Sequence, residues 1–273
     1  MKNSLNFVAS TSLIALLLAS CGSKNTITDK TIVVGASPTP HALILEAARP
    51  AIEAAGYSLK IVEFTDYVLP NLSLQDGELD ANYFQHLPYL EDFNVNNDTD
   101  LVSALAVHFE PLGIYAGQKT SLAQVASGDR IAIPNDNTNG GRALLLLAQE
   151  GLLIPKEGTA AKGIAVTLAD FDNSLYQLDI YQTNAEAVPA ALGDVAFGVI
   201  NGNYALSAQV TDSILAQEST ESAAALTYAN IIAVKAGNEN AEAITVLKEA
   251  LTTETVRNFI LDTFGGVVVP VFA

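Results

Sequence analysis

The chain contains very little cysteine and histidine, and each shortage excludes a class of site. One cysteine in 273 residues excludes an intramolecular disulfide and any zinc or redox centre built on paired cysteines. The three histidines, His41, His86 and His108, do not stand at metal-ligand spacing from one another. The sequence therefore gives no reason to expect a metal ion or another cofactor.

Basic residues are scarce as well, with 13 lysines and arginines against 30 acidic residues and a formal net charge of −17. A chain of this charge repels the phosphates of nucleic acids and anionic lipid headgroups, so we expect no nucleic-acid partner. The acidic surface is explained by solubility alone. With 49% apolar and 16% charged residues, the composition predicts a folded protein with a substantial core.

Recognised catalytic motifs are missing from the sequence. It has no GxSxG elbow, no HExxH pair, no Walker loop and no GxGxxG turn. We therefore predict that the protein is not an enzyme. A secreted hydrolase that sets one of the histidines beside a carboxylate is the alternative, and it predicts turnover of a substrate.

The single cysteine, Cys21, stands at an informative position. It follows an apolar stretch, residues 7–18, that is too short and too interrupted to span a bilayer. Leu18-Ala19-Ser20-Cys21 looks like a lipobox, so residues 1–20 are predicted to be a lipoprotein signal peptide and residues 21–30 a lipidated tether. Two acyl chains on Cys21 would hold the protein on the extracytoplasmic side of the cell membrane. An ordinary signal peptide followed by a chance cysteine is the alternative.

From residue 31 onward, short apolar strands alternate with helical stretches, which predicts an α/β fold with largely parallel sheets. Strands are predicted at residues 31–35, 59–64, 80–84, 101–108, 112–117, 130–134, 165–168, 177–181, 195–200 and 228–235. Helices are predicted at residues 41–55, 69–75, 86–96, 139–149, 185–192, 241–251 and 255–264. Pro50 is expected to kink or split the first of these helices.

The length and the order of these segments favour two lobes with a shared cleft over one large domain. Phe109-Glu110-Pro111 interrupts two apolar strands, and we place a crossing between lobes there. The predicted first lobe comprises residues 31–110 plus 229–273, and the second comprises residues 111–228. We expect a monomer, because no heptad or apolar stripe requires a partner.

Aromatic residues are concentrated in one segment of the predicted first lobe. Residues 64–93 hold six of the 19 tyrosines and phenylalanines, including Tyr67, Phe84 and Tyr89. Ligands in open α/β sheets bind beyond the carboxyl ends of strands, where Tyr67, Phe84 and His86 are expected to lie. The segment therefore predicts an aromatic-walled site, although packing in the core is the alternative for any single ring.

A second group of candidate residues is polar. Residues 135–142 follow a predicted strand and open an apolar helix, and free backbone N–H groups at such a helix start favour an anion. Arg142 in this turn is suited to hold a carboxylate with two hydrogen bonds. Asn201 and Asn230 add amide groups close to other strands, although asparagine is also a common turn residue. Together these groups suit a zwitterion with an apolar tail.

These residues occur in motifs that resemble the NlpA family of lipoproteins, over residues 31 to the C-terminus with a lipobox ahead. The resemblance implies a two-lobed periplasmic-binding fold of the second type, with the ligand in the cleft between the lobes. It also implies L-methionine as ligand and an ABC importer with permease and ATPase subunits as partner. The motifs are residues 37–41, 64–67, 80–89, 133–142, 201–204 and 228–230.

The resemblance also implies a role for each site residue. The methionine side chain would contact Tyr67, Phe84, His86 and Tyr89, its carboxylate would bind Arg142 and Asn139, and its backbone atoms would bind Asn201 and Asn230.

Two positions depart from the family pattern without removing a contact: Asn137 stands where many relatives carry proline, and Tyr83 where a second phenylalanine is frequent. Two other functions remain open. One is a binding protein for another amino acid or for a methionyl dipeptide. The other is a surface adhesin-type lipoprotein, in which replacing Arg142 would change nothing.

Overall fold

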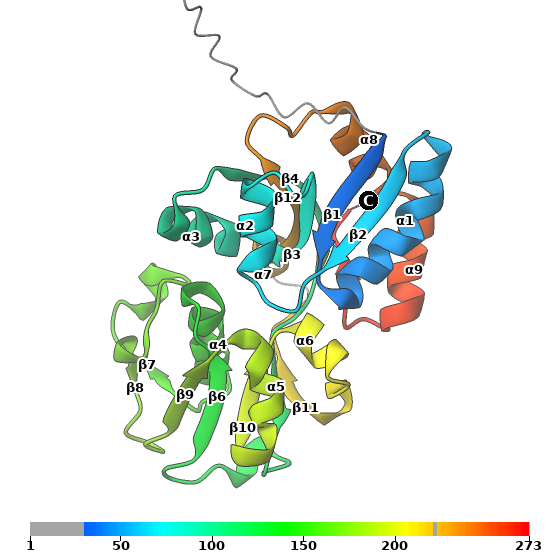
Figure 1. Cartoon of the computed structure of the whole chain (residues 1–273). Helices are drawn as coiled ribbons and strands as arrows, with labels where there is room; N and C mark the ends of the chain where they lie inside the picture. The colour runs from blue at the N-terminus through cyan, green and yellow to red at the C-terminus, as the bar shows by residue number, and fades with distance from the viewer. Residues whose placement is uncertain (1–29, 221–222, 273) are drawn as a thin grey trace, which may run out of the picture.

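The computed structural model describes residues 30–220 and 223–272, which form two lobes, each built on its own β-sheet (Figure 1). Because the chain passes between the sheets more than once, each lobe is assembled from separate parts of the sequence. This confirms the predicted two-lobed α/β fold. Cys21, the signal peptide and all of the tether except Lys30 lie outside the described residues.

The first lobe is built on a six-stranded sheet of order β13-β4-β12-β3-β1-β2. Its strands are β1 (Thr31–Ala36), β2 (Ser58–Glu63), β3 (Ala81–His86), β4 (Leu101–Phe109), β12 (Ala229–Lys235) and β13 (Val269–Pro270). Its helices are α1 (Leu43–Ala54), α2 (Leu69–Gln75), α3 (Leu87–Asn97), α8 (Glu242–Leu251) and α9 (Glu254–Phe264), and α7 (Ala223–Thr227) lies in the segment that leads from β11 of the other sheet back to β12. All six residues of β3 are buried, as expected of a strand inside a sheet covered on both faces.

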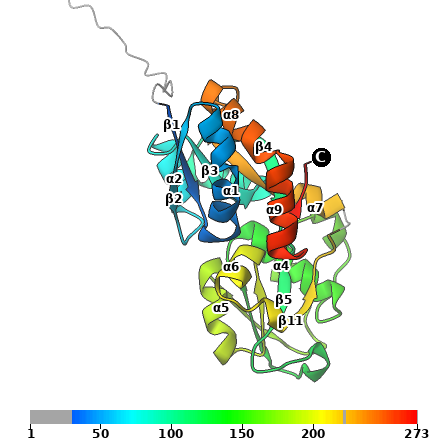
Figure 2. The ribbon, with the colours of Figure 1, turned by 90° about the vertical axis from the view of Figure 1, so that its right-hand side faces the viewer.

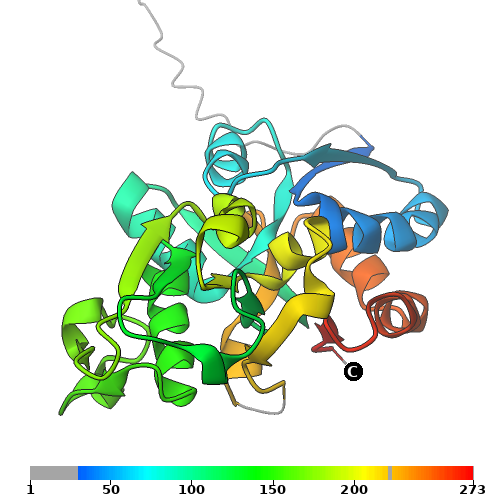
Figure 3. The same cartoon turned by 90° about the horizontal axis from the view of Figure 1, so that it is seen from below.

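The second lobe is built on a five-stranded sheet of order β11-β5-β10-β6-β9, and it lies nearest the viewer when the molecule is seen from below (Figure 3). Its strands are β5 (Gly113–Ala116), β6 (Arg130–Pro134), β9 (Asp179–Thr183), β10 (Phe197–Ile200) and β11 (Ile214–Gln217). Its helices are α4 (Asn137–Gln149), α5 (Val188–Ala191) and α6 (Gly202–Ser207), and a short separate ribbon joins β7 (Ile154–Pro155) to β8 (Phe171–Asp172).

The C-terminal helices pack back on the first lobe, as predicted. Ile44 of α1, Ile244 of α8 and Ile260 of α9 are fully buried in one hydrophobic core with Ile32 and Val34 of β1. Figure 2 shows α1, α8 and α9 together on one side of the sheet. Because α8 and α9 follow β12, the chain must have returned from the second lobe before it ends.

Two predictions about local structure were wrong, and a third was wrong in part. Residues 165–168 form no strand, because the Asp170 carboxylate accepts hydrogen bonds from the backbone and hydroxyl of Thr167 and closes a turn. Of the two effects expected of Pro50, a kink or a split, the split does not occur, since Pro50 lies on the exposed face of α1, where water can bond the carbonyl it leaves unpaired. The sheets are mixed rather than largely parallel: β4 leads out of the first lobe and β12 leads back, so the two pair antiparallel.

The chain leaves the first sheet at Phe109 and enters the second at Gly113, so Glu110 lies in the segment between the two sheets. Within the described residues, no helix has both the length and the apolar character needed to cross a bilayer.

Candidate ligand site between the lobes

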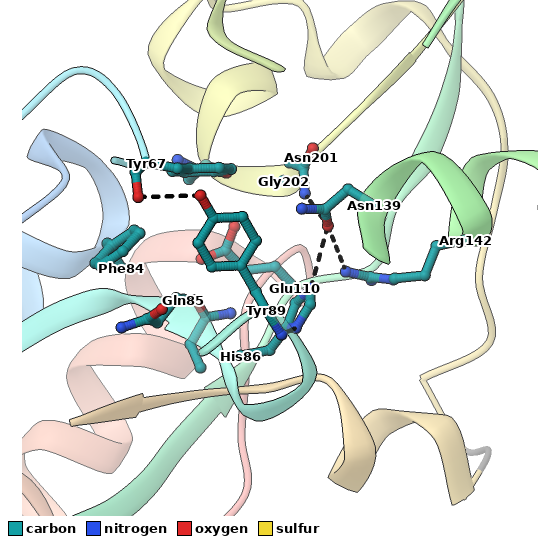
Figure 4. A pocket seen from close by; sticks show the side chains of 12 residues that line it. Tyr67, Phe84, Gln85, His86, Tyr89, Glu110, Asn139, Arg142, Asn201 and Gly202 are labelled. Carbon is teal, nitrogen blue, oxygen red and sulfur yellow. Dashed lines mark hydrogen bonds between the residues drawn. The ribbon is translucent and has the colours of Figure 1, made fainter. Parts of the chain in front are cut away.

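A cavity lies between the lobes, and all eight predicted site residues line it (Figure 4). The first lobe contributes Tyr67 from the loop after β2, Phe84 and His86 from β3, Tyr89 from α3 and Asn230 from β12. The second lobe contributes Asn139 and Arg142 from α4 and Asn201 from the start of α6. Four further residues of the cavity lining were not predicted: Gln85, Glu110, Gly202 and Asn203.

The aromatic wall of the cavity comes from the first lobe alone. The Tyr67 ring lies 5.6 Å from that of Phe84 and 5.7 Å from that of Tyr89, measured between centroids. Phe93 supports the Tyr89 ring from behind, and the Tyr89 hydroxyl donates to the backbone carbonyl of Tyr67. Burial raises the pKa of the Tyr67 and Tyr89 hydroxyls, so both rings stay neutral. The wall is therefore apolar and held in place.

His86 ends β3 and caps α3, which fixes its tautomer. Its Nδ1 accepts the backbone N–H of Tyr89 at 3.1 Å, so the ring proton is on Nε2 and is donated to Asn139 Oδ1, also at 3.1 Å. Burial, together with the charge of Arg142, lowers the pKa of His86 to about 3. His86 is thus a neutral donor at neutral pH that reaches from the first lobe to the second.

Asn139 Oδ1 accepts hydrogen bonds from three side chains. In addition to His86, Asn201 Nδ2 donates to it at 2.8 Å and Arg142 Nη1 at 3.3 Å. The amide group of Asn139 is turned this way because its nitrogen donates to Asp136, the cap of α4. An amide oxygen has two lone pairs, so it can form good hydrogen bonds with two donors but not with all three at once.

Arg142 is 3% exposed, and Glu218 holds it in place. Its Nε and Nη2 donate to the two Glu218 oxygens at 3.0 and 2.5 Å, and its guanidinium lies 4.2 Å from the centre of the Tyr228 ring. The sequence predicted that Arg142 holds a ligand carboxylate with two hydrogen bonds. In the structure its Nε and Nη2 donors make such a pair with Glu218 instead. Only the Nη1 edge is turned toward Asn139 and the cavity.

Glu110 is the carboxylate in the cavity lining, and two histidines pair with it. His108 Nε2 lies 2.7 Å and His41 Nε2 3.4 Å from Glu110 Oε1, and His41 Nε2 also lies 2.9 Å from Asn230 Oδ1. These histidine and glutamate atoms lie within 4.8 Å of one another, a grouping that sequence spacing did not indicate. The Nε2 atoms of both histidines are engaged in hydrogen bonds, whereas His41 Nδ1 is buried and has no hydrogen-bond partner among the described residues.

The two lobes are joined across the cavity by hydrogen bonds besides that of His86. The Tyr67 hydroxyl donates to Asn203 Oδ1 at 2.6 Å, and the Tyr204 hydroxyl donates to the carbonyl of Thr65 at 3.2 Å. At the rim, Asn137 Nδ2 lies 3.2 Å from a carboxylate oxygen of Asp92. The structure thus has its lobes closed over a cavity with one aromatic end and one polar end.

The NlpA lipoprotein family matches residues 32–272 of this chain. The methionine-binding lipoprotein MetQ of Bacillus subtilis is 38% identical over 93% of this chain and 94% of its own. A lipoprotein structure from Ruminococcus gnavus has a TM-score of 0.85 at 47% identity, covering 88% of this chain and 99% of the other. A nutrient binding protein from Burkholderia cenocepacia, solved with methionine bound, has a TM-score of 0.82 at 37% identity over 88% of this chain and all of its own. The chain belongs to the NlpA lipoprotein family.

Proposed function

We propose that this protein binds L-methionine between its lobes and delivers it to an ATP-driven importer. The two ends of the cavity support this. Tyr67, Phe84 and Tyr89 form an aromatic end suited to a thioether, whose contact with a ring contributes about 0.3–1.5 kcal/mol. The polar end carries the guanidinium of Arg142 and several amides. The methionine bound to the Burkholderia cenocepacia relative and the name of the Bacillus subtilis relative favour the same ligand.

The observation that carries the proposal is the crowding of donors at Asn139 Oδ1. His86 and Arg142 both direct an N–H at that oxygen, as does Asn201. A ligand carboxylate beside Asn139 would offer two charged oxygens to the same donors, and charge-assisted hydrogen bonds are about twice as strong as neutral ones. We therefore assign the carboxylate of methionine to this corner, with Arg142 contributing its Nη1 edge.

Each of the other site residues has a role in this proposal. His86 forms part of the side-chain pocket with the aromatic wall, and Asn201 and Asn230 bind backbone atoms of the ligand. Closure occurs at the chain crossings near residues 109–111 and 228–229, between lobes formed by residues 31–110 with 229–273 and by residues 111–228. The protein captures its ligand and does not transform it.

The deciding experiment is calorimetric titration of the mature domain with L-methionine, after bound ligand has been removed by unfolding and refolding. We expect one-to-one binding that Arg142→Ala weakens by about 10- to 150-fold, as expected for a lost hydrogen bond to a charged group. Arg130→Ala is the matched control, because Arg130 is exposed and pairs with Asp179 at the edge of the same lobe. If the wild-type protein binds no methionine, we would titrate a panel of amino acids and methionyl dipeptides. Absence of binding to every ligand in that panel would favour the adhesin alternative.

Delivery of the ligand to a membrane importer requires that the protein be held at the membrane, and we propose that a lipid anchor does this. Cys21 would carry the acyl chains, and residues 22–30 would let the monomeric binding domain reach its permease. Cys21→Ser should move the protein from the membrane fraction to the medium or the periplasm, while isolated binding of methionine is unchanged. Retention of Cys21→Ser on membranes would contradict an acyl anchor at this residue.

A further inference from the structure

Three buried amide side chains of the first lobe form a group of their own next to the aromatic wall. Asn71 of α2 and Asn82 of β3 are fully buried, and Gln85 of β3 is 3% exposed. Of the three, Gln85 lines the cavity (Figure 4), whereas Asn71 and Asn82 do not. The two asparagines can therefore act on a ligand only through Gln85.

The side chain of Gln85 is bound at both ends by the two asparagines. Its Nε2 donates to Asn71 Oδ1 at 2.7 Å and to Asn82 Oδ1 at 3.0 Å. Its Oε1 accepts from Asn71 Nδ2 at 2.9 Å, and Asn82 Nδ2 donates to Asn71 Oδ1 at 2.8 Å. An amide nitrogen has two N–H donors, so Gln85 has no donor left for a ligand.

A bulge in β3 determines the direction of the Gln85 side chain. Two consecutive residues of β12 pair with Tyr83 and Gln85, so Phe84 is the extra residue on β3. Side chains three positions apart on a regular strand point to opposite faces of the sheet. Asn82 and Gln85 are three positions apart, yet both bond to Asn71 of α2. The bulge thus turns Gln85 toward the face that α2 covers.

The hydroxyl donors at the aromatic end of the cavity are used within the protein as well. The Tyr67 hydroxyl donates to Asn203 Oδ1, and the Tyr89 hydroxyl donates to the backbone carbonyl of Tyr67. Phe84 has no polar atom in its side chain. These three aromatic side chains and Gln85 therefore offer no free N–H or O–H group to a ligand, although three of the four are polar.

We infer that Asn71 and Asn82 are positioning residues that set the specificity of the cavity, because they keep the amide of Gln85 bound within the protein. This inference rests on the proposed function and adds the class of ligand that the cavity rejects. A side chain with a carbonyl oxygen at the position of the methionine sulfur would lose water and gain no donor, which is costly. A thioether sulfur is only a weak acceptor, so methionine loses little at the same place.

The test compares two ligands that differ at one position of the side chain. L-2-Amino-5-oxohexanoate, the keto analogue, has a carbonyl group in place of the methionine sulfur and keeps the terminal methyl group. We expect the wild-type protein to bind the keto analogue about 5- to 150-fold more weakly than L-methionine, as for a buried acceptor without a donor. Calorimetric titration of the ligand-free protein gives both Kd values.

Asn71→Leu should relax this preference, because it removes one acceptor of Gln85 Nε2 and so frees an N–H for the ligand. The ratio of the Kd for the keto analogue to that for methionine should fall by about 2- to 12-fold, as for one gained neutral hydrogen bond. Adding Gln85→Leu to this variant removes the freed amide and should restore the wild-type ratio. Asn94→Leu is the matched control, because this half-buried amide of α3 bonds to the backbone of Leu101 and does not line the cavity.

A second variant keeps the test decisive if Asn71→Leu does not fold. Asn82→Leu removes the other acceptor of Gln85 Nε2 and should lower the same ratio. Equal weakening of both ligands in the folded variants would overturn the inference and leave the three amides a structural link between α2 and β3. Equal affinities of the wild-type protein for the two ligands would overturn it while the proposed function stands. If the wild-type protein binds neither ligand, the proposed function fails and the inference fails with it.

Discussion

The two lobes contribute different chemistry to one cavity. The first lobe supplies the aromatic wall of Tyr67, Phe84 and Tyr89 together with every histidine of the chain. The second supplies the charged pair of Arg142 and Glu218 and the amides of α4 and α6. In the proposed function, the first lobe therefore selects the ligand side chain, and the second lobe supplies Arg142 and Asn139 for the ligand carboxylate. Under that proposal, a ligand needs both an apolar tail and a carboxylate to be held by both lobes at once.

The largest expected effect is on the free energy of unfolding, and it tests whether the aromatic wall binds the ligand as well as stabilising the first lobe. Phe84 of β3 and Phe197 of β10 are both buried, at 2% and 0% exposure, but only Phe84 lines the cavity. Either phenylalanine changed to alanine should lower the free energy of unfolding by about 3–5 kcal/mol. Only Phe84→Ala should also raise the Kd for methionine, by about 2- to 12-fold from the lost sulfur–aromatic contact. Denaturant unfolding and calorimetry on both variants separate the two roles, and equal changes in Kd would contradict them.

The next effect is a pH dependence carried by the first lobe. Burial lowers the pKa of His41 to about 4 and those of His86 and His108 to about 3, against 6.5 in an exposed chain. Below pH 6.5 these three histidines are therefore protonated in the unfolded chain but remain neutral in the folded protein until the pH approaches their lowered pKa values. As far as the histidines determine it, the free energy of unfolding is highest above about pH 6.5 and falls as the pH decreases, by about 2 kcal/mol per histidine between pH 7 and 5. The raised pKa of Glu110 opposes this trend.

Replacement of one histidine measures its share of this loss. His86→Gln should reduce the difference in unfolding free energy between pH 7 and pH 5 by about 2 kcal/mol, the share of one histidine, relative to wild type. Urea unfolding at the two pH values provides the measurement. An unchanged difference would mean that His86 is protonated in the folded protein.

The sequence predicted which residues line the cavity better than it predicted the interactions between them. Strand ends and a helix start are local features, so the positions of Phe84, His86 and Arg142 at a shared cavity could be predicted from their own segments. Glu218 could not, because it meets Arg142 across 76 positions of sequence, beside a strand that the apolar pattern did not reveal. Glu110 was taken only as part of a break between strands, since its partner His41 is brought to it by folding.

Local polar chemistry also explains where strand prediction failed. In residues 165–168 only Val166 is buried, so the short apolar run does not form one face of a sheet. The carboxylate of Asp170 then closes the turn that begins at Thr167. A capping carboxylate three residues downstream was the signal that could have corrected the assignment.

The third prediction concerns Asn139 Oδ1, the oxygen that accepts hydrogen bonds from side chains of both lobes. Asn139→Ala removes the acceptor shared by His86, Asn201 and Arg142, so the donors must find water or ligand instead. We expect methionine to bind about tenfold more weakly, since roughly 1.4 kcal/mol of orientation and cross-lobe bonding is lost. Asn240→Ala, on an exposed turn of the first lobe, should leave the Kd unchanged. An unaltered affinity for Asn139→Ala would show that the donors are oriented without this residue.

The smallest expected effect is at the rim, where the lobes touch through exposed groups. Asn137 Nδ2 reaches the Asp92 carboxylate at 3.2 Å, whereas the Tyr67 hydroxyl meets Asn203 in a partly buried contact at 2.6 Å. Water competes for the Asn137 contact, so Asn137→Ala should change the Kd by no more than about twofold, the usual range of surface substitutions. Tyr67→Phe, which removes the more sheltered bond, should weaken methionine by about 2- to 12-fold. If Asn137→Ala had the larger effect, closure would be set at the rim rather than by the buried contacts around the ligand.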